Sequence, residues 1–306
     1  MDRTVAPGAA DSGSTPLRNL RVIMYKIIDG NLISKTILEE LKNKTNVLNV
    51  TGKNRVMTDI LVGSDEASKI YIENKKKKFH DIGLKFNLVN LSSDIKEDEL
   101  ISIINKYNND IDTNAIFVEL PLPKQINENN IIDKIIPAKD VDGFSSNNLG
   151  ALFQGNKGFY PCTAEGIIEL LKRSNIDISG KHCVVVGRSN IVGKPVALLM
   201  LKENATVTIC HSKTNDLKSI CKTADILIAA LGKPKFIDET YIKSGAVVVD
   251  AGMHRITIND KKVVCGDVDF DKVAPLTSYI TPVPGGVGPM TVTMLIKHCI
   301  DTAEYE

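Results

Sequence analysis

The sequence predicts an α/β protein with two α/β domains, and three observations lead to that prediction. The chain has 306 residues, which is long for one domain and suits two. Its apolar content of 43% and charged content of 25% are typical of globular proteins with a hydrophobic core. Apolar runs of strand length alternate with segments of helical spacing. Such alternation predicts parallel sheets whose crossover helices cover their faces.

The first series of elements lies between residues 58 and 119. We expect strands at 58–63, 86–91 and 115–119, and helices at 66–82 and 97–107. Gly83 ends the first helix, and Pro121 and Pro123 end the last strand. The order β-α-β-α-β is that of a small parallel sheet.

The second series begins after Gly180. Strands are expected at 183–186, 205–210, 225–230 and 246–250, with a helix at 195–202. Between the two series, residues 142–158 (DGFSSNNLGALFQGNKG) are rich in Gly and Asn, which places the joint of the domains there.

The charge balance bears on possible partners. Lys and Arg number 38 and Asp and Glu number 37, so the formal net charge is +1. No overall field attracts nucleic acid or an acidic membrane, and neither is expected as a partner. No apolar run approaches the roughly 18 residues of a transmembrane helix, and no signal peptide is evident. A soluble, cytoplasmic protein is expected.

Two further features concern the compartment. Residues 1–23 differ in composition from the rest and are interpreted as a leader outside the fold, with Met24 as the natural start. An organellar transit peptide is the alternative for this segment. The six cysteines are dispersed without Cys-x-x-Cys or metal-ligand spacing, so we expect reduced, structural thiols and no metal site.

A glycine turn follows the strand at 183–186. Its sequence, from Gly187 to Pro195, is GRSNIVGKP and leads into a helix. Gly187 permits a tight turn and close approach to a phosphate, and Gly193 permits close packing, but Ser189 stands where a dinucleotide fingerprint has its second glycine. The turn alone leaves a dinucleotide site and a purely structural turn open.

The end of the next strand indicates the cofactor. NAD enzymes place a carboxylate there for the ribose hydroxyl, whereas this chain has Cys210, His211, Ser212 and Lys213. Arg188 can form a fork onto a 2′-phosphate that a carboxylate would repel. NADP is therefore preferred over NAD. The expected cofactor contacts are Gly187, Arg188, Ser189, Ile191, Val192, His211, Ser212 and Lys213.

A second candidate site lies on the helix at 66–82. Ser68, Tyr71 and Lys75 are spaced by three and four residues, so they share one helix face. A lysine one turn from a phenol suits proton transfer, because burial lowers the pKa of a lysine toward neutrality. A solvated surface helix is the alternative, since Lys75 begins a run of four lysines.

Taken together, several motifs resemble the methylenetetrahydrofolate dehydrogenase/cyclohydrolase family. These are VGSDEASKIYIENK, ELPLPKQI, PAKDVDGF, PCTAEG, GRSNIVGKP, CHSKT and TPVPGGVGPMTVTML, in the family's order from about Lys26 to the last helix. The resemblance implies two α/β domains with the active site in a cleft between them, a homodimer, and tetrahydrofolate derivatives as substrates. It also implies NADP-dependent oxidation of 5,10-methylenetetrahydrofolate to the methenyl form and hydrolysis of that form to 10-formyltetrahydrofolate.

The resemblance assigns roles to particular residues. Lys75 matches the family's catalytic lysine, Tyr71 its partner, and Asp142 the aspartate that binds the pterin ring. The substrate-binding set it implies is Tyr71, Lys75, Glu119, Leu120, Asp142, Pro284, Gly285 and Gly286. It further implies a folate-binding catalytic domain of residues 24–155 and 281–306, and a Rossmann-like NADP-binding domain of residues 156–280.

One position departs from the family's pattern. Glu119 stands where the family has glutamine before Leu-Pro-Leu-Pro. A carboxylate beside Lys75 favours the ammonium form, or it acts as the base itself, so Glu119 is counted with Lys75, Tyr71 and Asp142 as catalytic. We expect dehydrogenation to survive and hydrolysis to be reduced or shifted in pH. Three alternatives remain: a dehydrogenase without hydrolysis, a catalytically silent folate- and NADP-binding homologue, and an unrelated NADP oxidoreductase.

Overall fold

A computed structural model describes residues 24–63, 66–258 and 261–305, and it confirms the α/β prediction. The expected leader at 1–23 lies outside the described residues. The first part of the chain contains β1 (Lys26–Ile27), α1 (Gly30–Val50), β2 (Val56–Val62), α2 (Glu66–Asp81), β3 (Lys85–Leu91), α3 (Glu97–Asn109), β4 (Ala115–Val118), α4 (Glu128–Ile132) and α5 (Ser146–Gln154).

The rest of the chain forms a second set of elements. They are α6 (Cys162–Arg173), β5 (His182–Val186), α7 (Gly193–Lys202), β6 (Thr206–Cys210), α8 (Leu217–Cys221), β7 (Ile226–Ala229), β8 (Val247–Asp250), β9 (His254–Ile258), β10 (Lys261–Cys265), α9 (Phe270–Val273), β11 (Tyr279–Ile280) and α10 (Val287–Asp301). The expected strands agree with the observed strands to within one or two residues.

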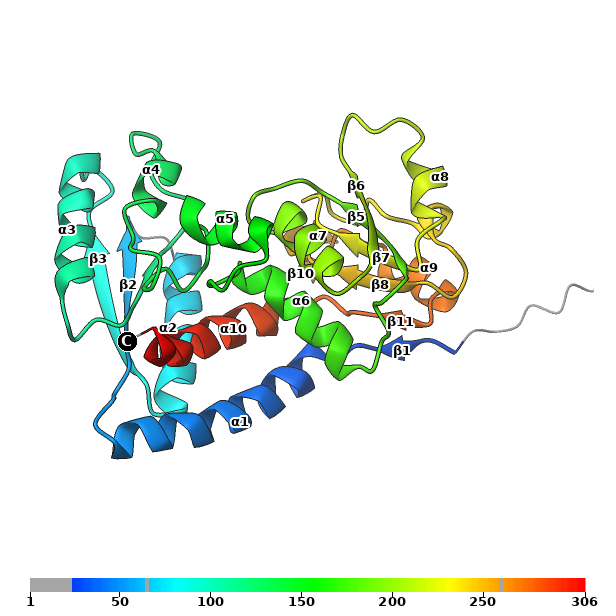
Figure 1. Cartoon of the computed structure of the whole chain (residues 1–306). Coiled ribbons are helices and arrows are strands. Elements are labelled where there is room, and N and C mark those ends of the chain that lie inside the picture. The colour runs from blue at the N-terminus through cyan, green and yellow to red at the C-terminus, as the bar shows by residue number, and fades with distance from the viewer. Residues whose placement is uncertain (1–23, 64–65, 259–260, 306) are drawn as a thin grey trace, which may run out of the picture.

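A three-stranded parallel sheet, in the order β3-β2-β4, forms the smaller half of the molecule (Figure 1). Its central strand, β2, is buried along almost its whole length, as parallel strands covered on both faces are. The register pairs Asp59 of β2 with Phe117 of β4. Side chains from these two strands therefore emerge close together.

A six-stranded sheet, in the order β1-β11-β8-β7-β5-β6, forms the larger half. All its strand pairs are parallel, and β5 lies between β6 and β7. The chain leaves β5 toward β6 on one side and later returns to β7 on the other. That reversal is the topological switch point beside which open α/β sheets bind ligands, at the carboxyl ends of the strands.

The first described residues join this larger sheet. Although residues 24–155 are expected in the first domain, β1 pairs in parallel with β11. The chain then enters α1, which starts beside β1 and runs below α10 toward the smaller half (Figure 1). The chain thus passes from the larger sheet to the smaller half through α1, near its N-terminal end, and again through α10, near its C-terminal end.

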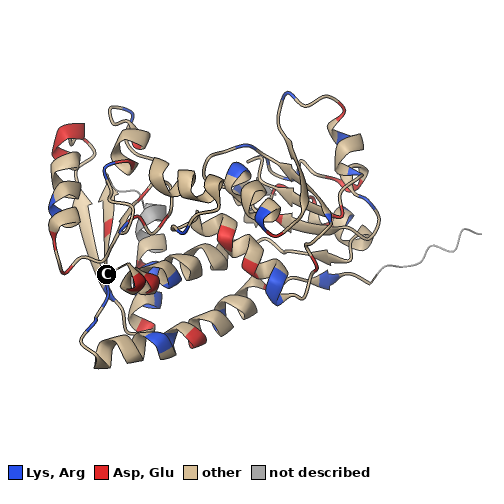
Figure 2. Ribbon diagram, in the orientation of Figure 1, with Lys and Arg blue, Asp and Glu red and all other residues tan. Residues whose placement is uncertain are grey.

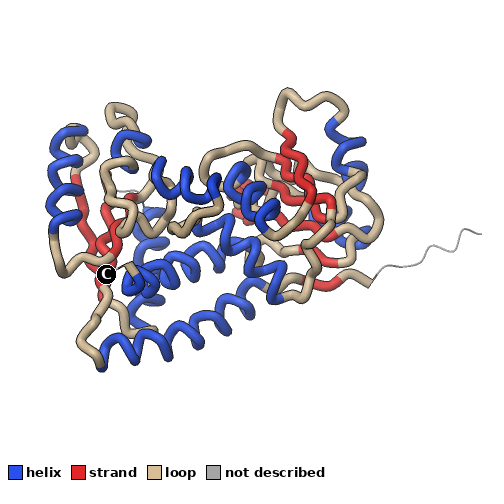
Figure 3. Tube along the Cα trace, in the orientation of Figure 1, coloured by secondary structure: helices blue, strands red, loops and turns tan. Residues whose placement is uncertain are grey.

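Helices α1, α6 and α10 pack against one another between the sheets, as the tube in Figure 3 shows. The packing of α6 on α10 is close at Gly166, where an added Cβ would lie 2.8 Å from Cβ of Met290. Ser34 of α1 and Thr293 of α10 share a buried hydrogen bond of 2.7 Å. Lys and Arg positions are interspersed with Asp and Glu positions over both halves (Figure 2).

The close packing of α6 on α10 predicts a stability difference between two glycines. Gly166→Val should lower the free energy of unfolding by about 2 kcal/mol, because its branched side chain overpacks the contact with Met290. Gly150→Val in α5 is the matched control, since nothing lies within 4 Å of an added Cβ there. Urea unfolding of both variants measures the difference. Equal effects at the two positions would contradict this account of the helix contact.

Candidate active site

Lys75 is the centre of the candidate site. It lies on α2 and is 1% exposed, although it begins a run of four lysines. Its Nζ lies 3.8 Å from the ring centre of Phe117 and 5.1 Å from that of Tyr71, one helical turn earlier. The alternative of a solvated surface helix is therefore wrong for Lys75. The side chain of Ser68, expected on the same face, lies outside the described residues.

Two carboxylates bind the Lys75 ammonium group. Nζ donates to Oδ2 of Asp59 at 2.9 Å and to Oε1 of Glu119 at 2.6 Å. Asp59 lies on β2, and Glu119 directly follows β4. Because β2 and β4 are adjacent parallel strands, both side chains reach Lys75 on α2. The sequence motifs indicate Glu119 but not Asp59, which lies in the apolar run expected to form a buried strand.

The carboxylates correct one sequence-based expectation. Burial is the largest influence on the ammonium group and by itself would lower the pKa of Lys75. The negative charges of Asp59 and Glu119 outweigh burial, so the pKa of Lys75 is raised instead of approaching neutrality. For Asp59, burial dominates and raises the pKa to about 7, even though the Lys75 charge opposes that shift.

Asp142 and Tyr71 lie near this cluster. Burial, and after it the charge of Asp140, raises the pKa of the Asp142 carboxyl to about 7. Burial raises the pKa of the Tyr71 phenol to about 12, and the charges of Lys75, Glu119 and Asp142 all act on it. The structure therefore brings together the four residues predicted to be catalytic.

The loop that carries Asp142 is fixed by its neighbour. Asp140 accepts hydrogen bonds from the backbone N–H groups of Gly143 at 3.0 Å and Ser145 at 2.8 Å, and from the Asn148 amide at 2.9 Å. Gly143 has a φ of +75°, and a Cβ there would lie 2.6 Å from the carbonyl oxygen of Phe159. Only glycine suits this position, so the turn sets where the Asp142 side chain begins.

A buried histidine of α10 forms a hydrogen bond to the same loop. His298 of α10 donates from Nδ1 to the carbonyl oxygen of Val141 at 2.8 Å and from Nε2 to Glu165 at 2.7 Å. Both partners are acceptors, so this arrangement requires the imidazolium form. Burial alone would raise the pKa of Glu165, but the charges of His298 and Lys297 lower it to about 2. No spacing pattern in the sequence identifies this pair.

The loop between β11 and α10 contains the predicted substrate-binding residues Pro284, Gly285 and Gly286. It packs on the start of α1, where a Cβ on Gly30 would lie 1.8 Å from the carbonyl oxygen of Gly286. Gly285 has a φ of +102°. Leu120, at the end of β4, is half-buried and packs on the core of the smaller sheet.

The glycine turn lies at the carboxyl end of β5, at the switch point. Gly187 has a φ of +143°, and a Cβ on it would lie 2.0 Å from the carbonyl oxygen of Ala230, which follows β7. Ser189 Oγ accepts hydrogen bonds from the backbone N–H groups of Val192 at 3.2 Å and Gly193 at 3.3 Å. Serine in place of glycine thus helps to shape the turn before α7.

The predicted cofactor residues share this edge of the sheet. The Gly187 N–H donates to the carbonyl oxygen of Cys210 at 2.9 Å, which joins the turn to the end of β6. Arg188, Ser189, Ile191, Ser212 and Lys213 are exposed, and Val192 and His211 are half-buried. The segment after β6 presents basic and hydroxyl side chains and no carboxylate at residues 211–213. The residues present therefore fit a 2′-phosphate.

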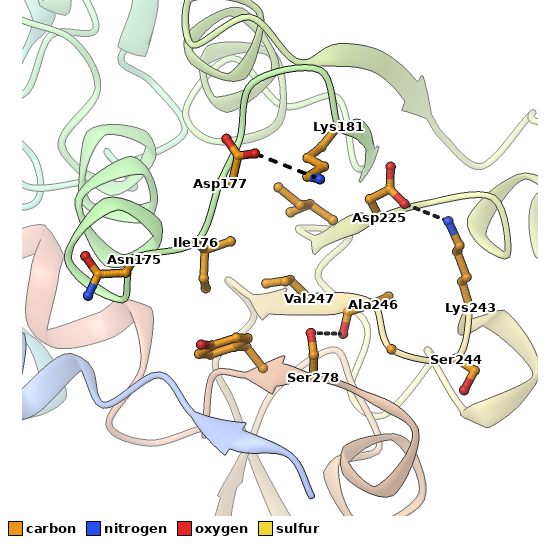
Figure 4. A pocket seen from close by; sticks show the side chains of 13 residues that line it. Asn175, Ile176, Asp177, Lys181, Asp225, Lys243, Ser244, Ala246, Val247 and Ser278 are labelled. Carbon is orange, nitrogen blue, oxygen red and sulfur yellow. Dashed lines mark hydrogen bonds and ion pairs between the residues drawn. The ribbon is translucent and has the colours of Figure 1, made fainter. Parts of the chain in front are cut away.

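Two cavities lie at opposite edges of the large sheet. One, of about 290 Å³, is lined by Phe144 and Leu149 from the smaller half and by Asn190 and Ile191 from the glycine turn, so the turn faces that half. The other, of about 300 Å³, lies at the opposite, amino edge of the large sheet (Figure 4).

The cavity in Figure 4 does not contain any of the predicted site residues. Its charged side chains already form ion pairs with one another. Nζ of Lys243 lies 2.6 Å from Oδ1 of Asp225, and Nζ of Lys181 lies 3.9 Å from Oδ2 of Asp177. Ligands of open α/β sheets bind at the carboxyl edge, so the candidate site is the one at Lys75 and the glycine turn.

Among the described residues, no helix is long and apolar enough to cross a membrane. In the part of the chain that the structure describes, no three His, Cys, Asp or Glu side chains are grouped to hold a metal ion. All six cysteines are free and buried.

Comparison with known proteins gives a consistent result. Residues 28–142 match the model of the tetrahydrofolate dehydrogenase/cyclohydrolase catalytic domain, and residues 161–306 match that of the family's NAD(P)-binding domain. The chain is 56% identical over 278 residues to the bifunctional protein FolD of Agathobacter rectalis, covering 91% of this chain and 99% of that protein.

Solved structures agree with the family models. The bifunctional FolD enzyme of Campylobacter jejuni is 42% identical and superimposes with a TM-score of 0.89, covering 92% of this chain and 99% of that one. The FolD enzyme of Trypanosoma brucei, solved with NADP cofactor and inhibitor, is 34% identical with a TM-score of 0.87, covering 92% and 98%. The chain therefore belongs to the tetrahydrofolate dehydrogenase/cyclohydrolase family.

Proposed function

We propose that the protein oxidises 5,10-methylenetetrahydrofolate to 5,10-methenyltetrahydrofolate with NADP and then hydrolyses the product to 10-formyltetrahydrofolate. The observation that carries this proposal is the buried Lys75, gathered with Tyr71 and Asp142 in a chain of this family. The Campylobacter jejuni relative, which is named as a methylenetetrahydrofolate dehydrogenase/cyclohydrolase, and the Agathobacter rectalis relative, which is named as bifunctional, support it. Tetrahydrofolate derivatives are accordingly the proposed substrates.

The first reaction depends on the position of its reactants. Bound NADP supplies the hydride acceptor. Gly187, Ser189, Ile191 and Val192 form the turn for its pyrophosphate, and the segment after β6 supplies His211, Ser212 and Lys213 near the ribose. The Asp142 carboxylate accepts from the N–H groups of the pterin ring, while Pro284, Gly285 and Gly286 border the substrate. Holding the reactants near attack distance lowers the barrier without proton transfer by the protein.

The second reaction needs proton transfer. Water adds to the methenyl carbon and loses a proton, and N5 gains a proton as its bond to that carbon breaks. Lys75 is the group that moves these protons, with the Tyr71 ring 5.1 Å from Nζ and Glu119 bonded to it. Because its pKa is raised, Lys75 begins the reaction as an ammonium group and must release a proton before it accepts one.

An incubation with both products followed together tests the proposed function. The purified protein is mixed with 5,10-methylenetetrahydrofolate and NADP, and NADPH and methenyltetrahydrofolate are recorded beside a control without enzyme. We expect NADPH to form while little methenyl compound accumulates. NADPH and methenyl compound rising in step would show a dehydrogenase without hydrolysis, and no NADPH would contradict the function altogether.

The assigned role of Arg188 gives a second prediction. Arg188→Ala should raise the KM for NADP by roughly 10- to 100-fold, because a charged hydrogen bond to the 2′-phosphate is lost. The KM for NAD should change little, since NAD lacks that phosphate. Lys181→Ala, which removes a positive charge at the opposite edge of the sheet, is the matched control. Equal losses with NADP and NAD would be inconsistent with this role.

Glu119→Gln tests how the second carboxylate acts. Dehydrogenation should continue at nearly the parent rate, because hydride transfer moves no proton at Lys75. The pH profile of hydrolysis should move to lower pH, since losing a negative neighbour lowers the pKa of both Lys75 and Asp59. The measurement is the initial rate of methenyltetrahydrofolate loss against pH. An unchanged rate and profile would show that Glu119 has no influence on Lys75.

A homodimer and a cytoplasmic location complete the proposal. The edge strand β6 exposes Ile209, and the neighbouring helix α7 exposes Leu201, so this side of the large sheet offers apolar contact area for a second copy. The bacterial relatives favour the cytoplasm over an organelle. The proposed division is residues 24–155 with 281–306, and residues 156–280, except that β1 joins the larger sheet, and it assigns the folate and the cofactor to different halves.

A further inference from the structure

Asp59 is the one charged residue of β2, whose sequence is VMTDILV. The strand is central in its sheet, and the Asp59 side chain is 0% exposed. An isolated carboxylate in such a place is strongly disfavoured unless a cation or several donors compensate it. Its partner is Lys75, at 2.9 Å.

The way Asp59 is bonded differs from that of other buried aspartates in this chain. Asp140, Asp250 and Asp267 each use both carboxylate oxygens to accept from backbone N–H groups, which fixes turns and loops. Within residues 24–63, 66–258 and 261–305, Oδ1 of Asp59 has no hydrogen-bond partner. Asp59 therefore holds no turn in place, and its one described hydrogen bond is to Lys75.

The three charged groups differ in their access to solvent. Asp59 is fully buried, whereas the Glu119 side chain is 14% exposed, and both carboxylates contact Nζ of Lys75. Lys75 can therefore exchange protons with a buried carboxylate on β2 as well as with the more exposed group that follows β4.

The charge state of Asp59 agrees with such an exchange. Burial raises its pKa to about 7, the Lys75 charge lowers it, and Glu119 raises it. The charged groups that face Asp59 are Lys75 from α2 and Glu119 from the end of β4, with Tyr71 facing Lys75 from the same helix. Near neutral pH the carboxyl group is therefore able to gain or lose a proton.

We propose that Asp59 takes up the proton that Lys75 releases when Lys75 removes a proton from the attacking water. This inference rests on the proposed hydrolysis and adds a residue that the family resemblance does not assign. Asp59 acts through Lys75 and does not touch the substrate, so it is a positioning residue that also stores the relayed proton.

The step balances without any further reactant. One Nζ proton of Lys75 first passes to Oδ2 of Asp59, so Asp59 becomes a neutral acid and Nζ a neutral amine. As the water oxygen bonds to the methenyl carbon, its O–H bond breaks and the proton passes to this amine, which makes Lys75 an ammonium group again. When the carbon–N5 bond breaks, the proton returns through Lys75 to N5, and the hydroxyl proton leaves to solvent as the formyl C=O forms.

Asp59→Asn tests this relay, because the amide keeps the shape of the carboxylate and accepts no proton. Hydrolysis of methenyltetrahydrofolate, measured directly against a control without enzyme, should fall about 100-fold in kcat, the usual scale of proton-transfer catalysis. The KM for the methenyl compound and the rate of NADPH formation should stay close to the parent values. The rise of hydrolysis with pH near 7 should disappear.

Thr58→Val is the matched control, since Thr58 is the neighbouring buried polar residue of β2 and bonds Thr113 on the other face. It should leave both activities and the pH profile unchanged. Equal loss of dehydrogenation and hydrolysis in Asp59→Asn would indicate a structural role and overturn the proposal, and so would unchanged hydrolysis. If the parent protein forms no NADPH, the proposed function itself fails, which is a different outcome.

The unmodified protein gives an independent measurement if Asp59→Asn does not fold. At saturating substrate, where the pterin ring holds Asp142 in its carboxylate form, hydrolysis should depend on a group that titrates near pH 7, while single-turnover hydride transfer should show no such dependence. A hydrolysis rate that is flat between pH 6 and pH 8 would overturn the relay.

Discussion

The ion pair between Lys75 and Asp59 is the interaction on which the site depends. A lysine that is 1% exposed remains charged only because two carboxylates compensate the loss of hydration. Those carboxylates come from β2 and from the end of β4, so the parallel register of a three-stranded sheet sets their spacing. The charge of Lys75, the proposed catalytic group, therefore depends on the pairing of these strands, and a change in their register would alter its pKa.

The rest of the molecule brings other groups to this point. Asp140 and Gly143 fix the turn that carries Asp142, and the His298 imidazolium holds the preceding carbonyl group. On the larger sheet, the strand order reverses at β5, and the hydrogen bond from Gly187 to Cys210 joins the two segments proposed to bind the cofactor. Helices α1, α6 and α10 connect the sheets, so the geometry of the site depends on helix packing as much as on the strands.

Much of this architecture can be predicted from sequence, and the exceptions have physical reasons. Strands such as β5 and β8 are short apolar runs rich in valine, which only a buried strand explains well. The sequence does not predict helix α1, because its buried face includes Gly30, Ser34 and Thr45 and shows little apolar periodicity. Lys75 and Asp142 are identified by their motifs. Asp59 is not, because a single carboxylate in an apolar run shows no spacing pattern, and its role depends on a contact across 16 residues.

The protonation state of Lys75 is the most direct test of this account. Nuclear magnetic resonance of the 15N-labelled lysine side chains, with the Lys75 signal identified by its absence from Lys75→Met, reports whether Nζ is an ammonium group. The account predicts an ammonium signal throughout pH 6 to 9, with a change in its shift near pH 7 as Asp59 titrates. A Lys75 amine that loses its proton near neutral pH would contradict it, because the carboxylates would then fail to outweigh burial.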